Sequence, residues 1–530
     1  MSWADKIFFG GKVYSMASEG EVAQAIAVKG DRIIAVGTDS DLLKWEGEKV
    51  NLFGKTVIPG LIDSHIHTTL TARALNSVLL GDCESMADII KKLKERAEKE
   101  APGTWIVGIG FDHEKLAEKR MPNRFDLDLA SVDHPIIISR CCLHIHSVNS
   151  LAIEIAKLGE NGENKDLLDA APDGTLLGIV REDAVVPVLA AAPDIAADRE
   201  VAKDMLEKTM LAMSATGLTG VHCLPGYEAD SLDKIGLFQE LESQGRLPLR
   251  VFLCFSDYPS FGIETGFGNS KIKYGLFKIF SDGSLGSRDA AMIEDYTDDP
   301  GNKGMLVHTQ EELVSLMRKA HDNRIQIGIH AIGDRGVDEA LTAFETIWQE
   351  NPREGTRFRL IHASVVSESL IERMKKLPIV LDVQPSFMAS VDLDWTDFRV
   401  GPRAKYAYPF KTFLREGIRL AGGSDCPVEI FNPFLGIHGA VNRQAADMHP
   451  IGGFHPEERL SVYEAISVYT KGSAYAAYEE NDKGTLEPGK FADFVALDRD
   501  PFEIDKSELC KVAVLASFLG GKQVSGGALA

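Results

Sequence analysis

The sequence has little positive charge, and this deficit excludes several kinds of partner. It carries 57 lysine and arginine residues against 79 aspartate and glutamate residues, a formal net charge of -22 at pH 7. Such an excess repels the phosphates of nucleic acids and the anionic headgroups of lipids. We therefore expect no nucleic-acid or membrane partner and a small molecule as the ligand. Composition leaves open whether the chain forms a homo-oligomer.

Long apolar runs and closely paired cysteines are also lacking. No stretch approaches about 18 uninterrupted apolar residues, the length that a membrane-spanning helix needs. The first residues, MSWADKIFFGGKVYSM, contain no basic segment followed by an apolar core. The seven cysteines are scattered, and none has CxxC spacing. These absences predict a cytoplasmic protein with reduced and mostly buried cysteines.

Strand-like segments at both ends enclose a long middle in which apolar strands alternate with helical patterns. The ends, residues 1–57 and 481–530, predict one discontinuous β-sandwich, although two separate terminal extensions remain an alternative. The middle, residues 58–70 and 205–480, predicts an α/β fold, a (β/α)8 TIM-type barrel. Its eight predicted strands are VIPGLIDSHIH and residues 217–223, 249–255, 274–283, 324–331, 357–363, 378–387 and 418–427.

One connection is much longer than the others. Residues 71–204 separate the first barrel strand from the second, and they contain the strand-like pieces TWIVGIG and PIIISRCCLHIHSV. A structureless loop of this length is not expected inside a compact protein. We therefore expect an inserted α/β subdomain after the first strand.

The first strand, VIPGLIDSHIHTTL at 57–70, ends in two histidines one residue apart. In an extended chain, side chains i and i+2 point to the same side, so His65 and His67 face one ligand together. Two ordinary histidines on a half-polar strand are the alternative. Asp63, one strand period earlier, is a candidate to support His65 from behind.

Other barrel strands also end in groups that can bind a metal. The carboxyl ends of the strands converge at one mouth of a barrel, so these side chains are expected to meet there. Singly, each has a structural explanation, as a buried hydrogen-bonded histidine or a turn aspartate. Together they predict a site for one or two divalent cations, Zn²⁺ first, with Mn²⁺, Fe²⁺ or Co²⁺ as alternatives. The predicted ligands are His65, His67, Lys278, His330, His362 and Asp425.

Lys278 is the unusual member of this set, because a protonated ammonium repels a metal. It fits only as a buried neutral amine, or as the carbamate that CO2 forms with such an amine, which could bridge two cations. The alternative is a lysine that forms a salt bridge with Asp282.

These residues and the sequence around them resemble the amidohydrolase superfamily, and within it the amidohydrolase-3, YtcJ-like branch. The similar phrases run in order along nearly the whole chain and include VIPGLIDSHIH, LHIHSVNSLAI, FKIFSDGSLGSRDAAM, HAIGDRGVDEAL and GGSDCPVEIFNPFLGIHGAV. The resemblance implies metal-dependent hydrolysis of a non-peptide C–N bond in a small amide-like substrate, such as an N-acyl or N-formyl compound. It also implies that His65, His67 and Asp425 hold one metal, that His330 and His362 hold the second, and that carboxylated Lys278 bridges them.

The resemblance further implies a substrate-binding place for Asp112 and His144, which lie in the inserted segment. The sequence departs from the branch at Ile361, where a glutamate often precedes the strand-six histidine, and His113 after Asp112 has no assigned role beyond a surface one. Arg288, after strand four, is a candidate to bind a substrate carboxylate or carbonyl. Its alternative is an ion pair with Asp282 or Asp289.

Asp425 is the predicted catalytic residue. A bound metal makes water a better nucleophile at neutral pH, and Asp425 would take the proton and pass it to the leaving nitrogen. A mononuclear deaminase of the same superfamily is the alternative, with Asp334 in the place of the usual glutamate and no role for Lys278. A non-catalytic assembly protein is a more distant alternative, because all six metal-binding groups are present.

Overall fold

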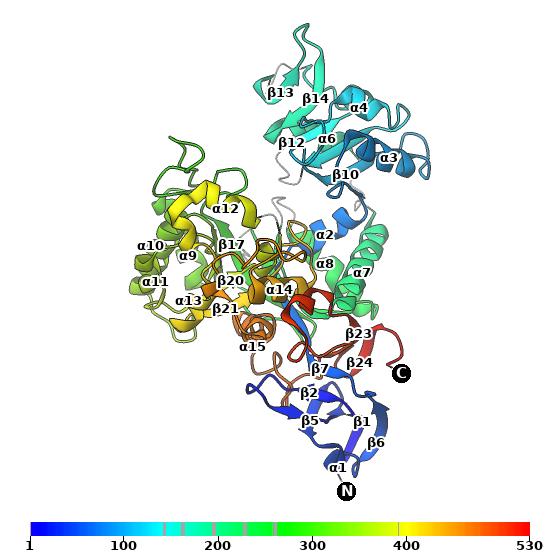
Figure 1. Ribbon diagram of the computed structural model, residues 1–530, viewed down its shortest axis with the longest axis vertical. Coiled ribbons are helices and arrows are strands. Elements are labelled where there is room, and N and C mark those ends of the chain that lie inside the picture. The colour runs from blue at the N-terminus through cyan, green and yellow to red at the C-terminus, as the bar shows by residue number, and fades with distance from the viewer. Residues whose placement is uncertain are drawn as a thin grey trace. The chain divides into compact units, whose positions relative to one another are not determined.

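The computed structural model describes residues 2–140, 145–160, 165–192, 198–225, 231–256, 258, 262–390 and 392–529. The chain divides into two compact units (Figure 1). The larger unit joins Met1–Thr69 to Glu207–Ala530, and the smaller unit is Leu70–Leu206. The larger unit holds the predicted metal-binding residues.

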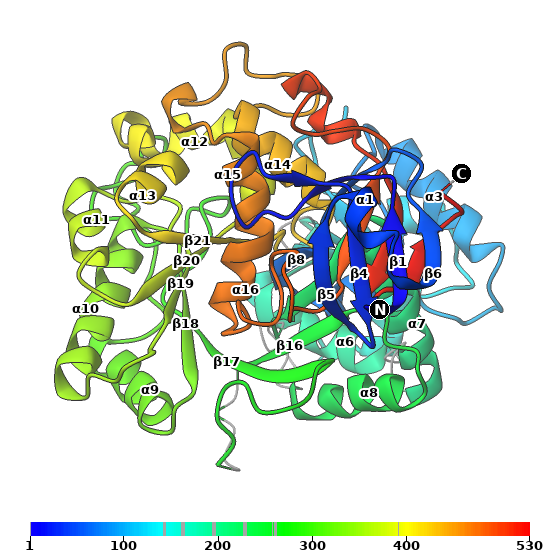
Figure 2. The ribbon, with the colours of Figure 1, turned by 90° about the horizontal axis from the view of Figure 1, so that it is seen from below.

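The centre of the larger unit is a sheet of eight parallel strands in the order β21-β20-β19-β18-β17-β16-β15-β8, which curves into a barrel (Figure 2). The residues of most of these strands are buried throughout, as expected for parallel strands that helices cover on the outside. The predicted (β/α)8 barrel is confirmed. The strands are β8 (Leu61–Ile66), β15 (Leu218–Cys223), β16 (Arg250–Phe255), β17 (Ile272–Phe280), β18 (Gln326–Ala331), β19 (Phe358–His362), β20 (Ile379–Val383) and β21 (Arg419–Gly422).

The helices of this unit follow the strands, and their sequences show why they form. At the start of α9, the Thr309 hydroxyl accepts from the Glu312 amide, and the Glu312 carboxylate accepts from the Thr309 amide. Leu313 and Met317 are buried on one face of this helix. No helix in the described part of the chain is long and apolar enough to cross a membrane. The helices within this unit are α1 (Asp39–Leu42), α8 (Ser231–Ser243), α9 (Gln310–Asp322), α10 (Asp334–Glu350), α11 (Glu368–Met374), α12 (Asp392–Val400), α13 (Phe410–Arg415), α14 (Pro433–Asn442), α15 (Val462–Ser467) and α16 (Ser473–Ala476). The chain passes between the two units within α2 (Thr68–Leu75) and α7 (Arg199–Ala215).

The first and last barrel strands approach each other through the residues that follow β21. The Asp425 amide donates to the His65 carbonyl at 2.7 Å, and the Asp63 carboxylate accepts from the amides of His65 and Ser424 at 3.0 and 3.1 Å. Gly423 allows this approach, because a Cβ there would lie 2.5 Å from the His65 nitrogen. Asp63 thus fastens the two ends of the barrel sheet directly below the predicted ligands.

Three predicted barrel strands are shorter than expected. The one expected over VIPGLIDSHIH begins only at Leu61, because Thr56–Pro59 form a strand of another sheet. The strand expected over 378–387 ends at Val383, and Pro385 begins a 3-10 helix, η3 (Pro385–Ala389). Proline has no amide hydrogen to continue the ladder, so the longer strand was wrong. The strand expected over 418–427 ends at Gly422, because the chain then turns to bring Asp425 beside β8.

The two ends of the chain form two further sheets, with strand orders β5-β4-β1-β6 and β24-β23-β22-β7-β2-β3. In the second sheet, β22 from the carboxyl end pairs antiparallel with β7 from the amino end. Phe8, Phe494 and Phe518 pack together in the core between these segments. The strands are β1 (Trp3–Phe9), β2 (Lys12–Tyr14), β3 (Val22–Ala23), β4 (Ala25–Lys29), β5 (Arg32–Gly37), β6 (Glu46–Asn51), β7 (Thr56–Pro59), β22 (Phe494–Leu497), β23 (Val514–Leu519) and β24 (Lys522–Gly526).

The smaller unit contains one sheet of its own, in the order β13-β14-β12-β11-β10-β9. Apolar side chains such as Leu93, Phe111 and Ile138 form a core on it. Its strands are β9 (Val78–Leu79), β10 (Ile106–Phe111), β11 (Ile136–Arg140), β12 (Ile145–Val148), β13 (Leu168–Ala170) and β14 (Leu176–Arg181), and its helices are α3 (Met86–Ala97), α4 (Arg124–Asp128), α5 (Ser150–Ala156) and α6 (Val186–Ala191).

Candidate metal centre

Three of the predicted ligands come together at the carboxyl ends of their strands. His65 is the second-last residue of β8, His362 ends β19, and Asp425 follows β21. One ligand atom from each lies within 4.8 Å of the others, and all three side chains are buried. Asp425 Oδ1 lies 3.1 Å from His65 Nε2 and 3.0 Å from His67 Nε2, so one carboxylate oxygen faces both histidines of the HIH motif.

His330 and Lys278 lie beside this group. The His330 ring centroid is 4.5 Å from that of His362, and its Nε2 lies 3.0 Å from the carbonyl of Gly283. Lys278 Nζ is buried without a hydrogen-bond partner and lies 5.0 Å from the centre of the Phe280 ring. A buried amine without partners is costly, and it needs either a lost proton or a ligand.

Burial and neighbouring charges set the protonation states of these groups. Burial lowers the pKa of His330 to about 3 and holds that of His362 well below its usual value, so both rings are neutral at pH 7. Burial also lowers the pKa of Lys278 to about 7. Burial disfavours the charged form of Asp425, but the adjacent His65 holds the pKa of this carboxyl well below its usual range. Free imidazole electron pairs and an ionised carboxylate are therefore available at neutral pH.

The chain bends sharply at two of these residues. His362 has a φ of 72° and Asp425 a φ of 59°, in the left-handed region that non-glycine residues rarely adopt. Such strain persists only where the surroundings enforce it, and it concentrates at functional sites. Here it turns each side chain into the barrel mouth as its strand ends.

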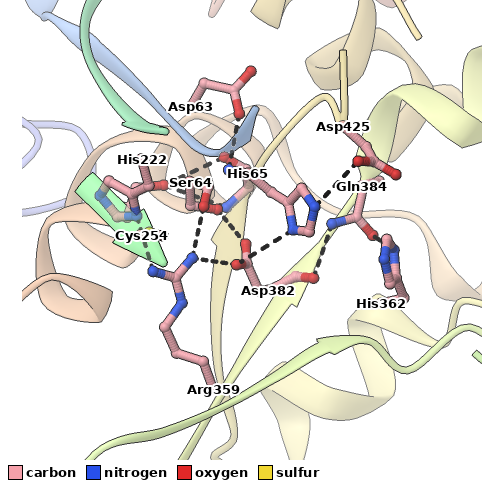
Figure 3. A network of polar contacts seen from close by, with 12 residues as sticks. Asp63, Ser64, His65, His222, Cys254, Arg359, His362, Asp382, Gln384 and Asp425 are labelled. Atoms are coloured by element: carbon pink, nitrogen blue, oxygen red, sulfur yellow. Dashed lines mark hydrogen bonds and ion pairs between the residues drawn. The ribbon is translucent and has the colours of Figure 1, made fainter. Parts of the chain in front are cut away.

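Asp382 in β20 and Gln384 directly after it lie beside His65 and His362 (Figure 3). Gln384 Oε1 lies 2.7 Å from His362 Nδ1, and Gln384 Nε2 donates to the Asp382 carbonyl at 3.0 Å. Because that carbonyl can only accept, the amide oxygen must face His362, and His362 Nδ1 must carry the proton. Nε2 of His362 is then the ring nitrogen that can bind a metal.

The donor set fits a divalent cation. Imidazoles and an ionised carboxylate are the ligands that Zn²⁺ and similar cations use, and here they converge in a buried site. Lys278, a buried polar group without a hydrogen-bond partner, points to the same conclusion. The geometry therefore fits a resident metal.

A family model described as the amidohydrolase family matches residues 48–525. The chain belongs to the amidohydrolase family. The resemblance inferred from its motifs is confirmed, and the protein is a metal-dependent hydrolase that acts on carbon–nitrogen bonds.

Relatives match this amidohydrolase over nearly its whole length. It is 32% identical to the putative amidohydrolase YtcJ of Bacillus subtilis (strain 168), over 98% of this chain and 99% of that protein. It is 26% identical to an N-substituted formamide deformylase of Arthrobacter pascens, over 98% of this chain and 97% of that protein. The crystal structure of an uncharacterized metal-dependent hydrolase from Pyrococcus furiosus has 31% identity and a TM-score of 0.76, covering 94% of this chain and 100% of that one.

The structure contradicts the alternative interpretation of Lys278 as a lysine in a salt bridge. Lys278 forms no salt bridge with Asp282, because the Asp282 carboxylate accepts from the backbone amides of Ala291, Ile332 and Gly333 at 2.8–3.0 Å. These bonds fasten the loops that follow β17 and β18, while Lys278 Nζ has no hydrogen-bond partner.

Arg288 forms an ion pair, but not with either expected carboxylate. Its Nη2 lies 2.7 Å from Asp298, rather than against Asp282 or Asp289. The chain turns back at Arg288, which has a φ of 63°. Asp298 lies ten residues farther along the chain. The turn at Arg288 therefore directs the guanidinium toward Asp298 and not toward either expected carboxylate.

The remaining predicted residues lie in the smaller unit or outside the described residues. Asp112 accepts from Arg140 at 2.9 Å, and the adjacent His113 is half-buried and accepts from the same arginine at 3.1 Å. His113 therefore has a structural partner that a surface role did not predict. His144 lies outside the described residues.

Sequence reasoning missed two residues at the end of β20. Asp382 lies in the strand and Gln384 directly follows it, one residue apart in IVLDVQ, as His65 and His67 are in the HIH motif. The same i, i+2 rule that selected the histidines would have selected this pair. Ile361 itself packs in an apolar cluster, and the polar contact to His362 comes from Gln384.

Proposed function

We propose that this amidohydrolase hydrolyses an amide-like, non-peptide C–N bond of a small molecule, with an N-acyl or N-formyl group as the acyl part. The single observation that carries the proposal is the buried cluster of His65, His362 and Asp425 at the barrel mouth. The near full-length similarity to an N-substituted formamide deformylase supports the choice of acyl group.

The metal would be held by the six residues of the predicted set. His65, His67 and Asp425 would hold one divalent cation, with Zn²⁺ first, and His330 and His362 would hold a second. Neutral Lys278 could add to CO2, forming an N–C bond and releasing one proton, and the resulting carbamate would bridge the two. When bound, the cation makes water more acidic and polarises the carbonyl oxygen of a substrate.

The protein's own groups would then move the protons. Asp425, ionised at neutral pH, would accept a proton from the attacking water and deliver it to the leaving nitrogen, so one carboxylate would act as base and then as acid. Gln384 would keep the proton of His362 on Nδ1. Substrate contacts by Asp112, His144 and Arg288 stay predictions.

A deaminase is less well supported. The aspartate that would replace the usual glutamate, Asp334, accepts from the backbone amides of Ile293 and Arg335 at 2.8 and 3.0 Å at the start of α10. These bonds give Asp334 a structural role. They leave the deaminase without its acid–base residue.

A screen of the metal-loaded protein tests the proposal. The panel contains N-formyl, N-acetyl and longer N-acyl amines and amino-acid amides, with cyclic ureas, imides and aminopurines added. We expect release of a carboxylate, with metal content near two equivalents by elemental analysis. Ammonia release from the aminopurines with one metal would instead support the deaminase. No turnover of any C–N substrate by the fully loaded protein would contradict the proposal.

A further inference from the structure

A fully buried arginine lies inside the barrel below the metal centre. Arg359, on β19, is 0% exposed. Its guanidinium contacts the carbonyl of Ser64 on β8 at 2.6 Å, His222 Nδ1 on β15 at 3.1 Å and the carboxylate of Asp382 on β20. Neither β8 nor β15 neighbours β19 in the sheet. Arg359 therefore crosses the barrel interior and connects β19 with two strands to which it has no backbone hydrogen bonds.

Asp382 connects this arginine to the metal centre. Its carboxylate accepts from the hydroxyl of Ser64 and from Arg359, and one oxygen lies 3.8 Å from His65 Nδ1 (Figure 3). The opposite nitrogen of the same ring, His65 Nε2, faces Asp425. Burial disfavours the charged form of Asp382, but Arg359 holds its pKa below the usual range, so the carboxylate is ionised.

Stability alone does not account for an ion pair in this place. Moving two charges into a protein interior costs several kcal/mol per ion, and a well-packed apolar pair is often at least as stable. His222, on the other side of Arg359, is neutral because burial and the arginine keep its pKa well below the usual value, so it adds no compensating charge. The contacts of the pair are therefore the better guide to its role.

We propose that Arg359 and Asp382 are positioning residues for the metal centre, which together fix the orientation and tautomer of His65. Arg359 holds the Asp382 carboxylate 3.8 Å from His65 Nδ1, which is buried without a hydrogen-bond partner. At this distance the negative charge of the carboxylate favours the ring proton on Nδ1 and leaves Nε2 for the metal. Gln384, the residue after β20, orients His362 by a direct hydrogen bond. The end of β20, which carries no predicted ligand, thus orients one histidine of each proposed metal. The inference rests on the proposed metal centre.

The experiment compares Asp382→Asn with a matched change elsewhere in the barrel unit. The control is Asp493→Asn, because Asp493 forms a comparable pair with Arg250, with contacts of 2.6 and 2.9 Å and both side chains 4% exposed. Arg250 is the first residue of β16, at the end of the strand opposite the barrel mouth. Both variants lose one carboxylate from a buried Arg–Asp pair, so both should lower the melting temperature.

Of these two variants, only Asp382→Asn should change metal binding. We expect its Zn²⁺ affinity, measured by competition with a chromophoric chelator, to fall about 10- to 100-fold. The visible absorption of the Co²⁺-loaded protein should change as well, because the His65 ligand is reoriented. Asp493→Asn should match the wild type in both measurements. Ser64→Ala, which removes one bond to the Asp382 carboxylate without leaving a buried charge, should shift affinity in the same direction by less.

Equal metal affinities and equal Co²⁺ spectra for Asp382→Asn, Ser64→Ala and wild type would overturn the inference. If Asp382→Asn does not fold, Ser64→Ala alone decides between the two results. Neither readout depends on turnover. A wild-type protein that binds metal but hydrolyses no C–N substrate would contradict the proposed function and leave the positioning role to be judged by affinity.

Discussion

Single residues carry the electrostatic cost of this site. Lys278 has no hydrogen-bond partner and its pKa is lowered to about 7, because burial penalises the ammonium. Asp425 is the opposite case, because the adjacent His65 keeps its carboxylate charged despite burial. Lys278, which readily loses its proton, and Asp425, which stays ionised, thus lie in the same barrel mouth. Both properties favour binding of a cation.

The pH dependence of stability should reveal Lys278 in the metal-free protein without CO2. Between pH 7 and about 10.5 the unfolded chain keeps a proton on this lysine that the folded chain has lost, so the free energy of unfolding rises with pH in this window. Below pH 7 both states are protonated and the penalty is fully present. In Lys278→Met this contribution disappears. Denaturant unfolding of both proteins should show a difference that changes by up to about 1.4 kcal/mol per pH unit; parallel profiles would contradict it.

Asp425→Asn should abolish proton transfer and leave the fold intact. Asparagine keeps an oxygen near His65 and His67 but cannot accept the proton, so turnover should fall by about 10²- to 10⁴-fold. The measurement is kcat on an active substrate from the panel at equal metal content, with circular dichroism and melting as controls for folding. Near wild-type turnover by a metal-loaded variant would rule out the assigned role.

Strands and their ends show how far the sequence could predict the site. Apolar runs that alternate with helical patterns were enough to locate all eight barrel strands. The expectation that functional residues lie at the carboxyl ends of barrel strands was enough to select His65, His362 and Asp425, which the structure brings together. Contacts between strands could not be predicted in this way. Arg359 meets Ser64 across the barrel interior, 295 residues away in the chain, and no local pattern encodes that distance.

The approach of β21 to β8 should depend on one glycine. In Gly423→Ala the new methyl group would lie 2.5 Å from the His65 nitrogen and 2.9 Å from its Cα, so backbone must move. We expect a loss of about 1–3 kcal/mol in the free energy of unfolding, together with weaker metal binding because His65 shifts. Gly37→Ala is the control, because a Cβ there meets nothing within 4 Å. Similar effects from both changes would show that the close approach is unimportant.

At the scale of the whole molecule, the chain contains two units with separate cores, and all six predicted ligands lie in the larger one. The sequence indicated an insertion after the first barrel strand by the length of the connection. The sequence could not predict which groups the insertion offers to a substrate. Loop conformation depends on tertiary packing, which leaves no periodic pattern in the sequence. The choice of substrate therefore stays the least predictable property of the protein.

Metal should stabilise the two units unequally. A ligand that binds only the folded larger unit adds about 2.7 kcal/mol to its stability at a free concentration one hundred times the dissociation constant. We expect calorimetry to resolve two transitions, of which Zn²⁺ raises one and a chelator lowers the same one. One transition that shifts as a whole would show that the units unfold together.

The fastening of Ser424 to Asp63 also has a consequence for synthesis of the protein in the cell. These residues are separated by 361 positions, which a ribosome takes roughly 20–70 s to translate at about 5–20 residues per second. During this interval β8 has been made, but the strand that completes the barrel and the carboxylate beside its histidines have not. Nascent chains stalled before Gly423 should therefore fail to retain a divalent cation, and the ion would enter only as one of the last steps of maturation.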